Sequence, residues 1–274
     1  MLRFRQDGIV VECAPETEHV SIPKGVKEIG SKAFCMCQEL KSVEIPNGVV
    51  KIGEMAFMGY TSLTEITIPE SVTEIDESAL GKCRCLATIK VSGDNPNYKD
   101  INGALYSKDG TTLLCYSSKS TDYVVPDGVT RIGMYAFASM NISSISLPNS
   151  LKEIGDYAFE DCDISSKIEI PNGVIKIGRG VFSNSFIKEI FIPDSVEEID
   201  HNTFDLCWIL ENIWVGKNNR YYMDIDGELY LKDGKTLVKT PEGRLPDPSE
   251  IMASDAYNWG IMFQGIDEEN QTDE

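Results

Sequence analysis

A period of 23 residues runs through the chain and constrains its fold more than any other feature. Pro23, Pro46 and Pro69 are spaced by 23 residues, and a similar pattern surrounds each proline. With residues 63–83 as a guide, the copies share the template L-x-x-I-x-I-P-x-x-V-x-x-I-G-x-x-A-F-x-x-C. A unit this short cannot bury its own apolar face, so neighbouring copies must stack and share one core. The period therefore predicts a solenoid.

Seven copies fit the template well. Their prolines are Pro23, Pro46, Pro69, Pro126, Pro148, Pro171 and Pro193. Their Ala-Phe steps are Ala33-Phe34, Ala56-Phe57, Ala136-Phe137 and Ala158-Phe159, with Ala79-Leu80, Val181-Phe182 and Thr203-Phe204 as variants.

Each position of the template has a physical reading. The alternation in I-x-I places two apolar side chains on one face of a short strand, which the proline ends. We expect one such strand per repeat, stacked in parallel, with V-x-x-I as the return leg. The Ala-Phe segment has the spacing of a single helical turn with Phe pointing inward, which predicts one buried column of phenylalanines.

The glycine of the template follows the return leg. Gly30, Gly53, Gly133, Gly155 and Gly178 occupy it, and we expect a positive φ there. Asp76 and Asp200 replace glycine in two copies, a substitution that the left-handed region tolerates.

Two longer segments, about 92–122 and 216–243, interrupt the period and match each other at a constant offset of 124 residues. Asp109-Gly110 and Asp233-Gly234 lie between apolar runs in these inserts. Asp-Gly in that setting signals a β-hairpin, so each insert is predicted to be a hairpin that projects from the stack. Since Pro69 and Pro193 keep the same offset, the chain resembles a tandem duplication.

Both ends depart from the period. Residues 4–13 resemble the second half of an insert without its upstream strand, which fits either a sequence cut from a longer parent or a cap made from half a unit. Residues 245–257 form a worn repeat followed by Trp259, and the run Asp267–Glu274 reads as a disordered acidic tail. We therefore expect an N-terminal half-hairpin or cap at 1–19, one solenoid at 20–257, and a C-terminal cap and tail at 258–274.

Charge and hydropathy exclude several classes of partner. The formal net charge of −19 would repel nucleic acid and anionic lipid, so neither is expected to bind. No stretch approaches the ~20 apolar residues of a membrane helix, and no export signal is visible in the given sequence.

Eight cysteines raise the question of a disulfide framework or a metal site. Cys37 and Cys83 share one template position but lie two coils apart, roughly 9.6 Å at the usual strand spacing of ~4.8 Å. That separation exceeds the ~7 Å Cα limit of a disulfide, and a shared zinc needs the sulfurs closer still. We expect eight free, buried thiols, with no metal and no cofactor.

Signals for catalysis or calcium are weak. Asp100-Ile-Asn102-Gly103 and Asp224-Ile-Asp226-Gly227 could open a calcium loop, but neither continues to the required terminal acid, so turn residues are the better reading. His19 and His201 are the two histidines and lie at opposite ends of the solenoid. No Ser-His-Asp, Cys-His or phosphate-binding glycine arrangement occurs, which favours a non-catalytic protein.

The template and the N-x-x-Y-x-D-I-x-G-x-L-Y pattern of the inserts resemble the BspA-like, Treponema-type leucine-rich repeats of bacterial surface proteins. The resemblance covers roughly residues 20–257. It implies a leucine-rich-repeat solenoid, β-rich and of α/β type, that forms a curved right-handed coil with a parallel sheet. It also implies an exported protein that adheres to host proteins or to other cells, with no catalytic residues to carry over.

The outward residue of each I-x-I step indicates where a partner could bind. These residues are Ser21, Glu44, Thr67, Lys90, Val124, Ser146, Glu169, Phe191 and Trp214. The last two are large and aromatic, so Phe191 and Trp214, with Glu169, Tyr221 and Tyr222, are the predicted protein-binding residues. The alternative, which we favour at this point because a bare aromatic pair is costly, is that Tyr221 and Tyr222 cover Trp214.

Two functions follow from these observations. The first is a non-catalytic adhesion or recognition module, at the cell surface or secreted, that binds host, other-cell or matrix protein. The alternative is an intracellular, cytoplasmic scaffold of the same fold, which the missing export signal and the free thiols would suit.

Overall fold

The computed structural model describes residues 2–5, 8–35, 37–59, 62–117, 120–164 and 168–241. They lie in one compact unit, Met1–Gly243. The worn repeat at 245–257, Trp259 and the expected cap and tail at 258–274 lie outside the described residues.

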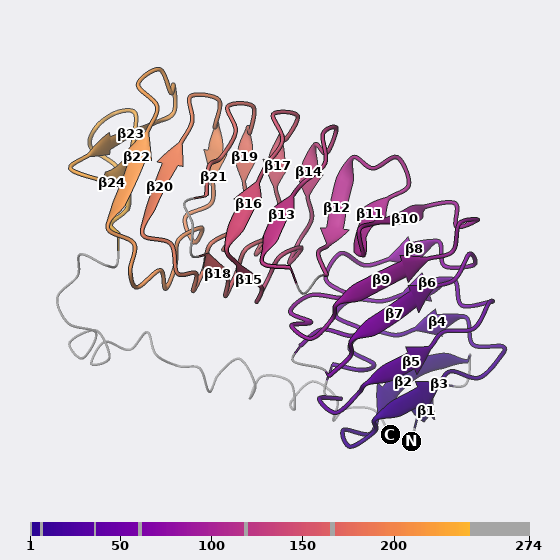
Figure 1. Ribbon diagram of the computed structural model, residues 1–274. Coiled ribbons are helices and arrows are strands. Elements are labelled where there is room, and N and C mark those ends of the chain that lie inside the picture. Colours follow the sequence, from indigo (N-terminus) through magenta and orange to yellow (C-terminus); the bar gives the residue numbers. More distant parts are fainter. Residues whose placement is uncertain are drawn as a thin grey trace, which may run out of the picture. The chain divides into compact units, whose positions relative to one another are not determined.

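The return legs of the repeats stack in register as parallel strands (Figure 1). In the first half these strands are β2 (Ile9–Cys13), β4 (Glu28–Ile29), β6 (Lys51–Ile52) and β8 (Glu74–Ile75). In the second half they are β12 (Thr112–Cys115), β14 (Arg131–Ile132), β17 (Glu153–Ile154), β19 (Lys176–Ile177) and β21 (Glu198–Ile199).

The I-x-I steps form a second set of parallel strands on another side of the coils. The pairs are β3 (His19–Ser21) with β5 (Ser42–Glu44), β7 (Glu65–Ile68) with β9 (Thr88–Val91), β13 (Asp122–Val124) with β16 (Ser144–Ser146), and β20 (Glu189–Ile192) with β22 (Asn212–Val215). β15 (Asn141–Ile142) and β18 (Asp163–Ile164) pair on a third side. The parallel stack is confirmed, but a typical coil carries two strands rather than the one expected, because its return leg also bonds to the neighbouring coil.

The Ala-Phe segment is a hydrogen-bonded turn, and no helix occurs among the described residues. The backbone N–H of Phe34 donates to the carbonyl of Ala56 in the next coil at 2.7 Å, so it is not available to a helix. Lys32, two residues before Phe34, has a φ of 59°, which also interrupts helical geometry. The predicted helical turn is therefore wrong.

The inward phenylalanines form two stacks rather than one column. Phe34 and Phe57 stack with ring centroids 4.8 Å apart. Phe137, Phe159, Phe182 and Phe204 form the second stack, with spacings of 4.9, 5.6 and 5.9 Å. All six side chains are at most 1% exposed, so their burial is confirmed, but the first insert separates the two stacks.

The template glycines are needed for close packing and not for a positive φ. None of the five has a positive φ. A Cβ at Gly30 would lie 2.8 Å from the carbonyl oxygen of Val10, and one at Gly155 would lie 2.8 Å from that of Ile132. The left-handed residue follows two positions later in these coils, for example at Lys32. Asp76 and Asp200 are not left-handed either, and their carboxylates accept the backbone N–H two residues on.

Each insert is a three-stranded antiparallel meander that lies against the end of the preceding ladders. The first contains β10 (Tyr98–Ile101), β11 (Ala104–Ser107) and β12; the second contains β23 (Tyr222–Ile225), β24 (Glu228–Leu231) and β25 (Leu237–Lys239). The hairpin turns are confirmed, but the inserts do not project freely. β12 pairs with β14, so the first insert begins the sheet of the second half.

The inserts satisfy hydrogen-bond donors that the ladders leave open. The Ile75 N–H donates to the Tyr98 hydroxyl at 2.8 Å, and the Val91 N–H donates to the Asp100 carboxylate at 2.8 Å. At the offset of 124, Ile199 donates to Tyr222 at 2.9 Å and Val215 to Asp224 at 2.8 Å. The two aspartates thus cap strands. The hairpin turns are formed by Asn102-Gly103 and by Asp226-Gly227, and all four residues have a positive φ. The expectation that Asn102-Gly103 and Asp226-Gly227 are turn residues is confirmed.

An antiparallel hairpin lies at the N-terminal side of the described residues. β1 (Leu2–Phe4) pairs with β2 in antiparallel fashion, as β11 pairs with β12. A bulge between Arg3 and Phe4 places Val10 opposite Phe4 and leaves Val11 exposed. Arg3 and Glu12 form an exposed ion pair at 2.5 Å on this hairpin.

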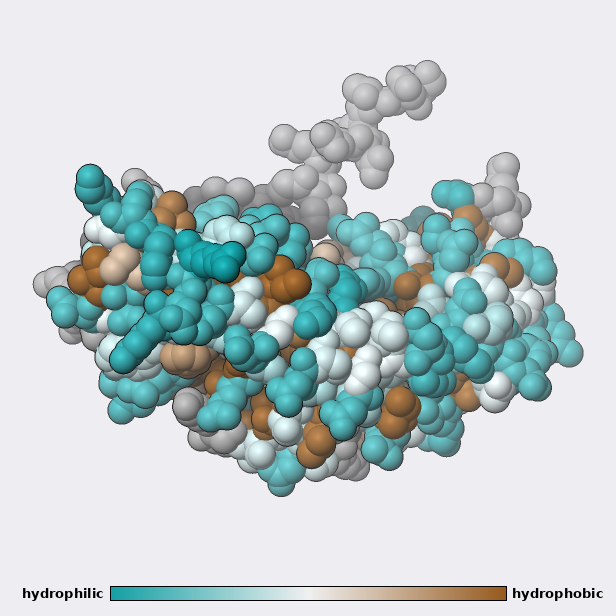
Figure 2. Space-filling model, turned by 90° about the horizontal axis from the view of Figure 1, so that it is seen from above, coloured by the Kyte–Doolittle hydropathy of each residue, from teal (hydrophilic) through white to brown (hydrophobic). Residues whose placement is uncertain are grey.

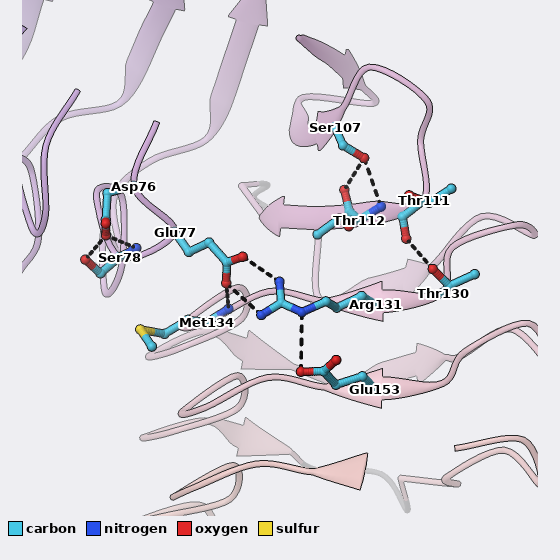
Figure 3. Close-up of polar contacts among 10 residues, drawn as sticks. All are labelled: Asp76, Glu77, Ser78, Ser107, Thr111, Thr112, Thr130, Arg131, Met134 and Glu153. Carbon is cyan, nitrogen blue, oxygen red and sulfur yellow. Dashed lines mark hydrogen bonds and ion pairs between the residues drawn. The ribbon is translucent and has the colours of Figure 1, made fainter. Parts of the chain in front are cut away.

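The two halves contact each other directly beside the first insert (Figure 3). Glu77, in the first half, accepts two bonds from the Arg131 guanidinium at 2.6 and 2.9 Å and a third from the Met134 N–H at 3.1 Å. Arg131 also lies 3.4 Å from Glu153. These contacts fix the register of the second half against the first.

Candidate partner-binding surface

Phe191 and Trp214 lie side by side on the outer face of β20 and β22. They are direct partners in the parallel register of these strands. Because side chains alternate along a strand, Ile190 and Ile213 point inward and are fully buried, whereas Phe191 and Trp214 point outward. Their exposed fractions are 43% and 42%. The strands therefore hold two aromatic side chains together in contact with solvent.

Polar residues lie beside this aromatic rung, which we define as Phe191 and Trp214. The Asn212 side-chain amide donates to the Glu189 carboxylate at 3.3 Å across the same two strands. Lys188 and Glu211 form an ion pair at 3.3 Å one residue further back. Glu169, on the coil before β20, is exposed. Polar side chains thus border the rung on these sides.

The two tyrosines that were predicted to bind a partner together with the rung differ in exposure. Tyr221 is 45% exposed, whereas Tyr222 is 6% exposed and its hydroxyl accepts the Ile199 N–H. Tyr222 caps the β21 strand and is not available to a partner, because its side chain is buried and its hydroxyl is hydrogen-bonded to Ile199. The favoured expectation that these tyrosines cover Trp214 is wrong, since Trp214 keeps 42% of its surface.

The first half contains the same rung with different residues. Thr67 and Lys90 pair across β7 and β9 at the positions 124 residues before Phe191 and Trp214. Lys90 forms an exposed ion pair with Glu65 at 2.7 Å. The flanking isoleucines are buried in both halves. A β-strand pair of this kind therefore forms without aromatic side chains on its outer face.

Sequence reasoning missed two further exposed apolar residues on the same two coils. Phe186 is 55% exposed and Ile209 is 44% exposed. At the offset of 124, the first half has Ser62 and Cys85. A residue-by-residue comparison of the two halves would have found both.

Other exposed apolar side chains include Ile225, Leu231 and Leu237 of the second insert. On the face that Figure 2 shows, hydrophobic residues are mostly separate spots among hydrophilic ones. Outer residues of the return strands carry alternating charges and pair between coils, as in Lys176 with Glu198 at 3.3 Å. A depression of about 500 Å³ beside Tyr222 is lined by both signs of charge, including Arg179 and Asp200. In the described part of the chain, no group of three or more His, Cys, Asp or Glu could hold a metal ion.

The cysteines serve packing within the stack. The thiols of Cys83, Cys162 and Cys207 donate to the carbonyl of the phenylalanine one coil earlier, at 3.1, 2.9 and 2.9 Å. Ser185 makes the same bond to Phe159 at 2.5 Å. Burial raises the pKa of the Cys162 thiol to about 12, so it stays protonated. Cys85 is exposed and Cys35 is half-buried, which corrects the expectation that all eight are buried.

One family model matches the sequence of these stacked coils. The model for the BspA type leucine-rich repeat region matches residues 12–108 and 110–224 in six copies. The chain belongs to the BspA-type leucine-rich repeat family. BspA-type repeats are generally non-catalytic scaffolds, and the solved structures that resemble this chain include bacterial surface proteins.

Several solved structures resemble this BspA-type solenoid. The pneumococcal vaccine antigen PcpA is 26% identical, with a TM-score of 0.69 over 75% of this chain and 52% of that one. A leucine-rich cell surface protein from Faecalibacterium prausnitzii is 31% identical, with a TM-score of 0.58 over 73% and 60%. A leucine-rich-repeat protein from Bacteroides ovatus is 27% identical, with a TM-score of 0.51 over 75% and 51%. The chain thus spans half to three fifths of the length of these relatives.

Comparison with curated proteins gives no match. Within the described ranges, no helix is long and apolar enough to cross a membrane.

Proposed function

We propose that this chain is a non-catalytic protein-binding module of a bacterial surface or secreted protein, and that the aromatic rung is the centre of its contact surface. The observation that carries this proposal is the difference between equivalent rungs. The same solenoid builds one rung from Thr67 and Lys90 and the other from Phe191 and Trp214. The fold therefore does not require aromatic residues at these positions.

The physical properties of the rung suit a protein partner. Two adjacent strands hold Phe191 and Trp214, so their backbone loses little freedom on binding. Aromatic side chains are enriched in the centre of protein interfaces, where a polar border excludes water around them. Glu169, Glu189 and Asn212 supply such a border, and exposed Tyr221 extends the surface toward the second insert.

The class of partner follows from charge and from the family. A net charge of −19 disfavours nucleic acid and anionic membranes. Relatives described as a cell surface protein and a vaccine antigen support an exposed location and a protein on a host cell, on another cell or in extracellular matrix.

The test replaces Phe191 and Trp214 by the residue types that occupy the equivalent positions in the first half, threonine and lysine. The double variant F191T/W214K and the parent chain are immobilised and exposed to solubilised extracellular matrix and to host-cell membrane extract. We expect proteins retained by the parent to be lost from F191T/W214K. The free energy of unfolding of the variant should lie within about 0.5 kcal/mol of the parent's, as is usual for substitutions at exposed positions.

The matched control is T67A/K90A, which changes the first-half rung. It should retain the same proteins as the parent. Equal retention by all three chains would contradict the proposed surface. A loss of stability well above 1 kcal/mol in F191T/W214K would assign the aromatic rung to the core of the fold.

A further inference from the structure

Two buried thiols meet where the N-terminal hairpin joins the first coil. Cys13 ends β2, and Cys37 follows the Ala-Phe turn of the next coil; they are 3% and 0% exposed. The Sγ of Cys37 lies 3.2 Å from the Cys13 carbonyl oxygen and 3.5 Å from that of Ala14. The Sγ of Cys13 lies 3.6 Å from the same Ala14 oxygen, so both sulfur atoms converge on one point.

This pair arises because Cys13 stands where later coils have phenylalanine. The thiols of Cys83 and Cys162 donate to the carbonyls of Phe57 and Phe137, whereas the thiol of Cys37 donates to the carbonyl of Cys13. The inward side chain of the preceding coil is then a second thiol instead of a ring. Burial, followed by a hydrogen bond with the Cys13 thiol, raises the pKa of Cys37 to about 12. The two thiols thus lie beside the same carbonyl oxygen, that of Ala14.

We propose that Cys13 and Cys37 are an oxidation site at which a small disulfide, such as oxidised glutathione, converts the two thiols into an intramolecular disulfide. The deprotonated sulfur of one cysteine attacks the small disulfide, forms a mixed disulfide and releases one small thiolate. The sulfur of the second cysteine then attacks the protein sulfur of the mixed disulfide, which forms the Cys13–Cys37 bond and releases the second small thiolate. Two protein thiols are oxidised, one small disulfide is reduced to two thiols, and the released thiolates take up the two protons.

The bond would tie the N-terminal hairpin to the stack. It closes a loop between residues 13 and 37 and so restricts the unfolded chain, the main way in which disulfides stabilise proteins. Disulfides form and persist in oxidising environments, which include the bacterial periplasm and the exterior of the cell. The oxidation site does not depend on the aromatic rung, so the failure of either proposal leaves the other intact.

The test is peptide mapping of the full chain after incubation in a glutathione redox buffer. Free thiols are alkylated in denaturant, and the chain is digested with trypsin. Cys13 lies in the peptide of residues 6–24, and Cys35 and Cys37 lie in the peptide of residues 33–41. We expect these two peptides to be recovered as one disulfide-linked species that separates after reduction.

Three serine variants identify the atoms involved. C37S should abolish the linked species, C35S should leave it unchanged, and C162S should leave it unchanged. Serine is tolerated at the position of Cys37 and Cys162, because Ser185 occupies it naturally.

A buried thiol with a raised pKa reacts slowly, so oxidation is carried out on the folded chain and also during refolding from urea in the same buffer. Hydrogen exchange of the β1–β2 hairpin should slow severalfold in the oxidised chain. Absence of the linked peptides under both conditions, or linkage through Cys35 that survives in C37S, would overturn the proposal.

Discussion

The two inserts cover the preceding coils with the same residues in the same way, whereas the matching residues on their other face differ in burial. Leu105 and Leu229, which are 124 residues apart, are at most 1% exposed and belong to the cores before their inserts. On the opposite face Tyr106 is fully buried in the second half, whereas its counterpart Tyr230 is half-buried and donates to Glu228.

This difference distinguishes the positions at which the repeat requires a particular residue from the positions at which the residue can vary. Positions that complete a ladder are alike in both inserts, as in Tyr98 with Tyr222 and Asp100 with Asp224. Positions that face outward vary with what lies next to them. The aromatic rung belongs to this second class, because Thr67 and Lys90 occupy the equivalent positions in the first half.

The largest expected effect is at the tyrosine whose burial differs between the inserts. Y106A should cost about 3–5 kcal/mol of unfolding free energy, because it removes a fully buried ring, and Y230A should cost about 1 kcal/mol. F159A, in the middle of the second phenylalanine stack, should also cost about 3–5 kcal/mol. Urea unfolding followed by circular dichroism measures all three. Equal losses for Y106A and Y230A would show that the two inserts are equivalent.

A leucine pair tests the same difference with an aliphatic side chain. Leu113 is fully buried and Leu237 is 49% exposed at the matching position. L113A should cost about 2–5 kcal/mol, and L237A should stay within about 0.5 kcal/mol of the parent. The comparison fails if L237A unfolds at a lower urea concentration than L113A.

The asparagines at the start of the inserts should instead behave alike. Asn95 donates to the carbonyls of Pro69 and Val72, and Asn219 donates to those of Pro193 and Val196, all at 2.8–2.9 Å. Each side-chain oxygen also accepts two backbone N–H groups. N95A and N219A should each cost about 2 kcal/mol, because buried groups lose their partners. Thermal melts that differ widely between them would contradict a shared capping role.

The smallest effect concerns pH. A hydrogen bond from the Ser107 hydroxyl, with bonds from Thr111, lowers the pKa of Asp109 from 3.8 to about 2. Backbone bonds from Thr236 and Lys235 also lower the pKa of Asp233. A depressed carboxyl pKa stabilises the folded state fully above the unfolded value near 4, and this contribution is lost as the pH falls to about 2.

The D109N and D233N variants isolate this contribution. The Tm difference between the parent and each variant should therefore shrink across that pH window. If the Tm difference between the parent and a variant does not change between pH 5 and pH 2, the aspartate of that turn does not contribute to the pH dependence of stability.

Much of the fold could be predicted from the repeat because its period is long and regular. The spacing of the prolines gives the stacking, and Asp-Gly gives the hairpins. The return strands were missed because they are two residues long, as in Glu28–Ile29, and two residues carry no alternation. The role of Gly30 could not be decided, since a positive φ and a close backbone contact both require a missing Cβ.

The position of the candidate site could be predicted from the sequence, but the exposure of its side chains could not. Alternation in I-x-I places Phe191 and Trp214 on the outer face, and register places them together. Whether Tyr222 covers them depends on how the insert folds, and its hydroxyl caps Ile199 instead. That hydrogen bond joins residues of two different elements, which a one-dimensional pattern does not relate.

Hydroxyl-radical footprinting of the free chain and of its complex with a captured partner tests the proposed surface most directly. Oxidation is quantified residue by residue with tandem mass spectrometry. In the free chain Phe191 and Trp214 should be oxidised readily, and in the complex their rates should fall severalfold while that of exposed Val124 stays the same. Unchanged rates at Phe191 and Trp214 in the complex, with protection elsewhere, would contradict the account.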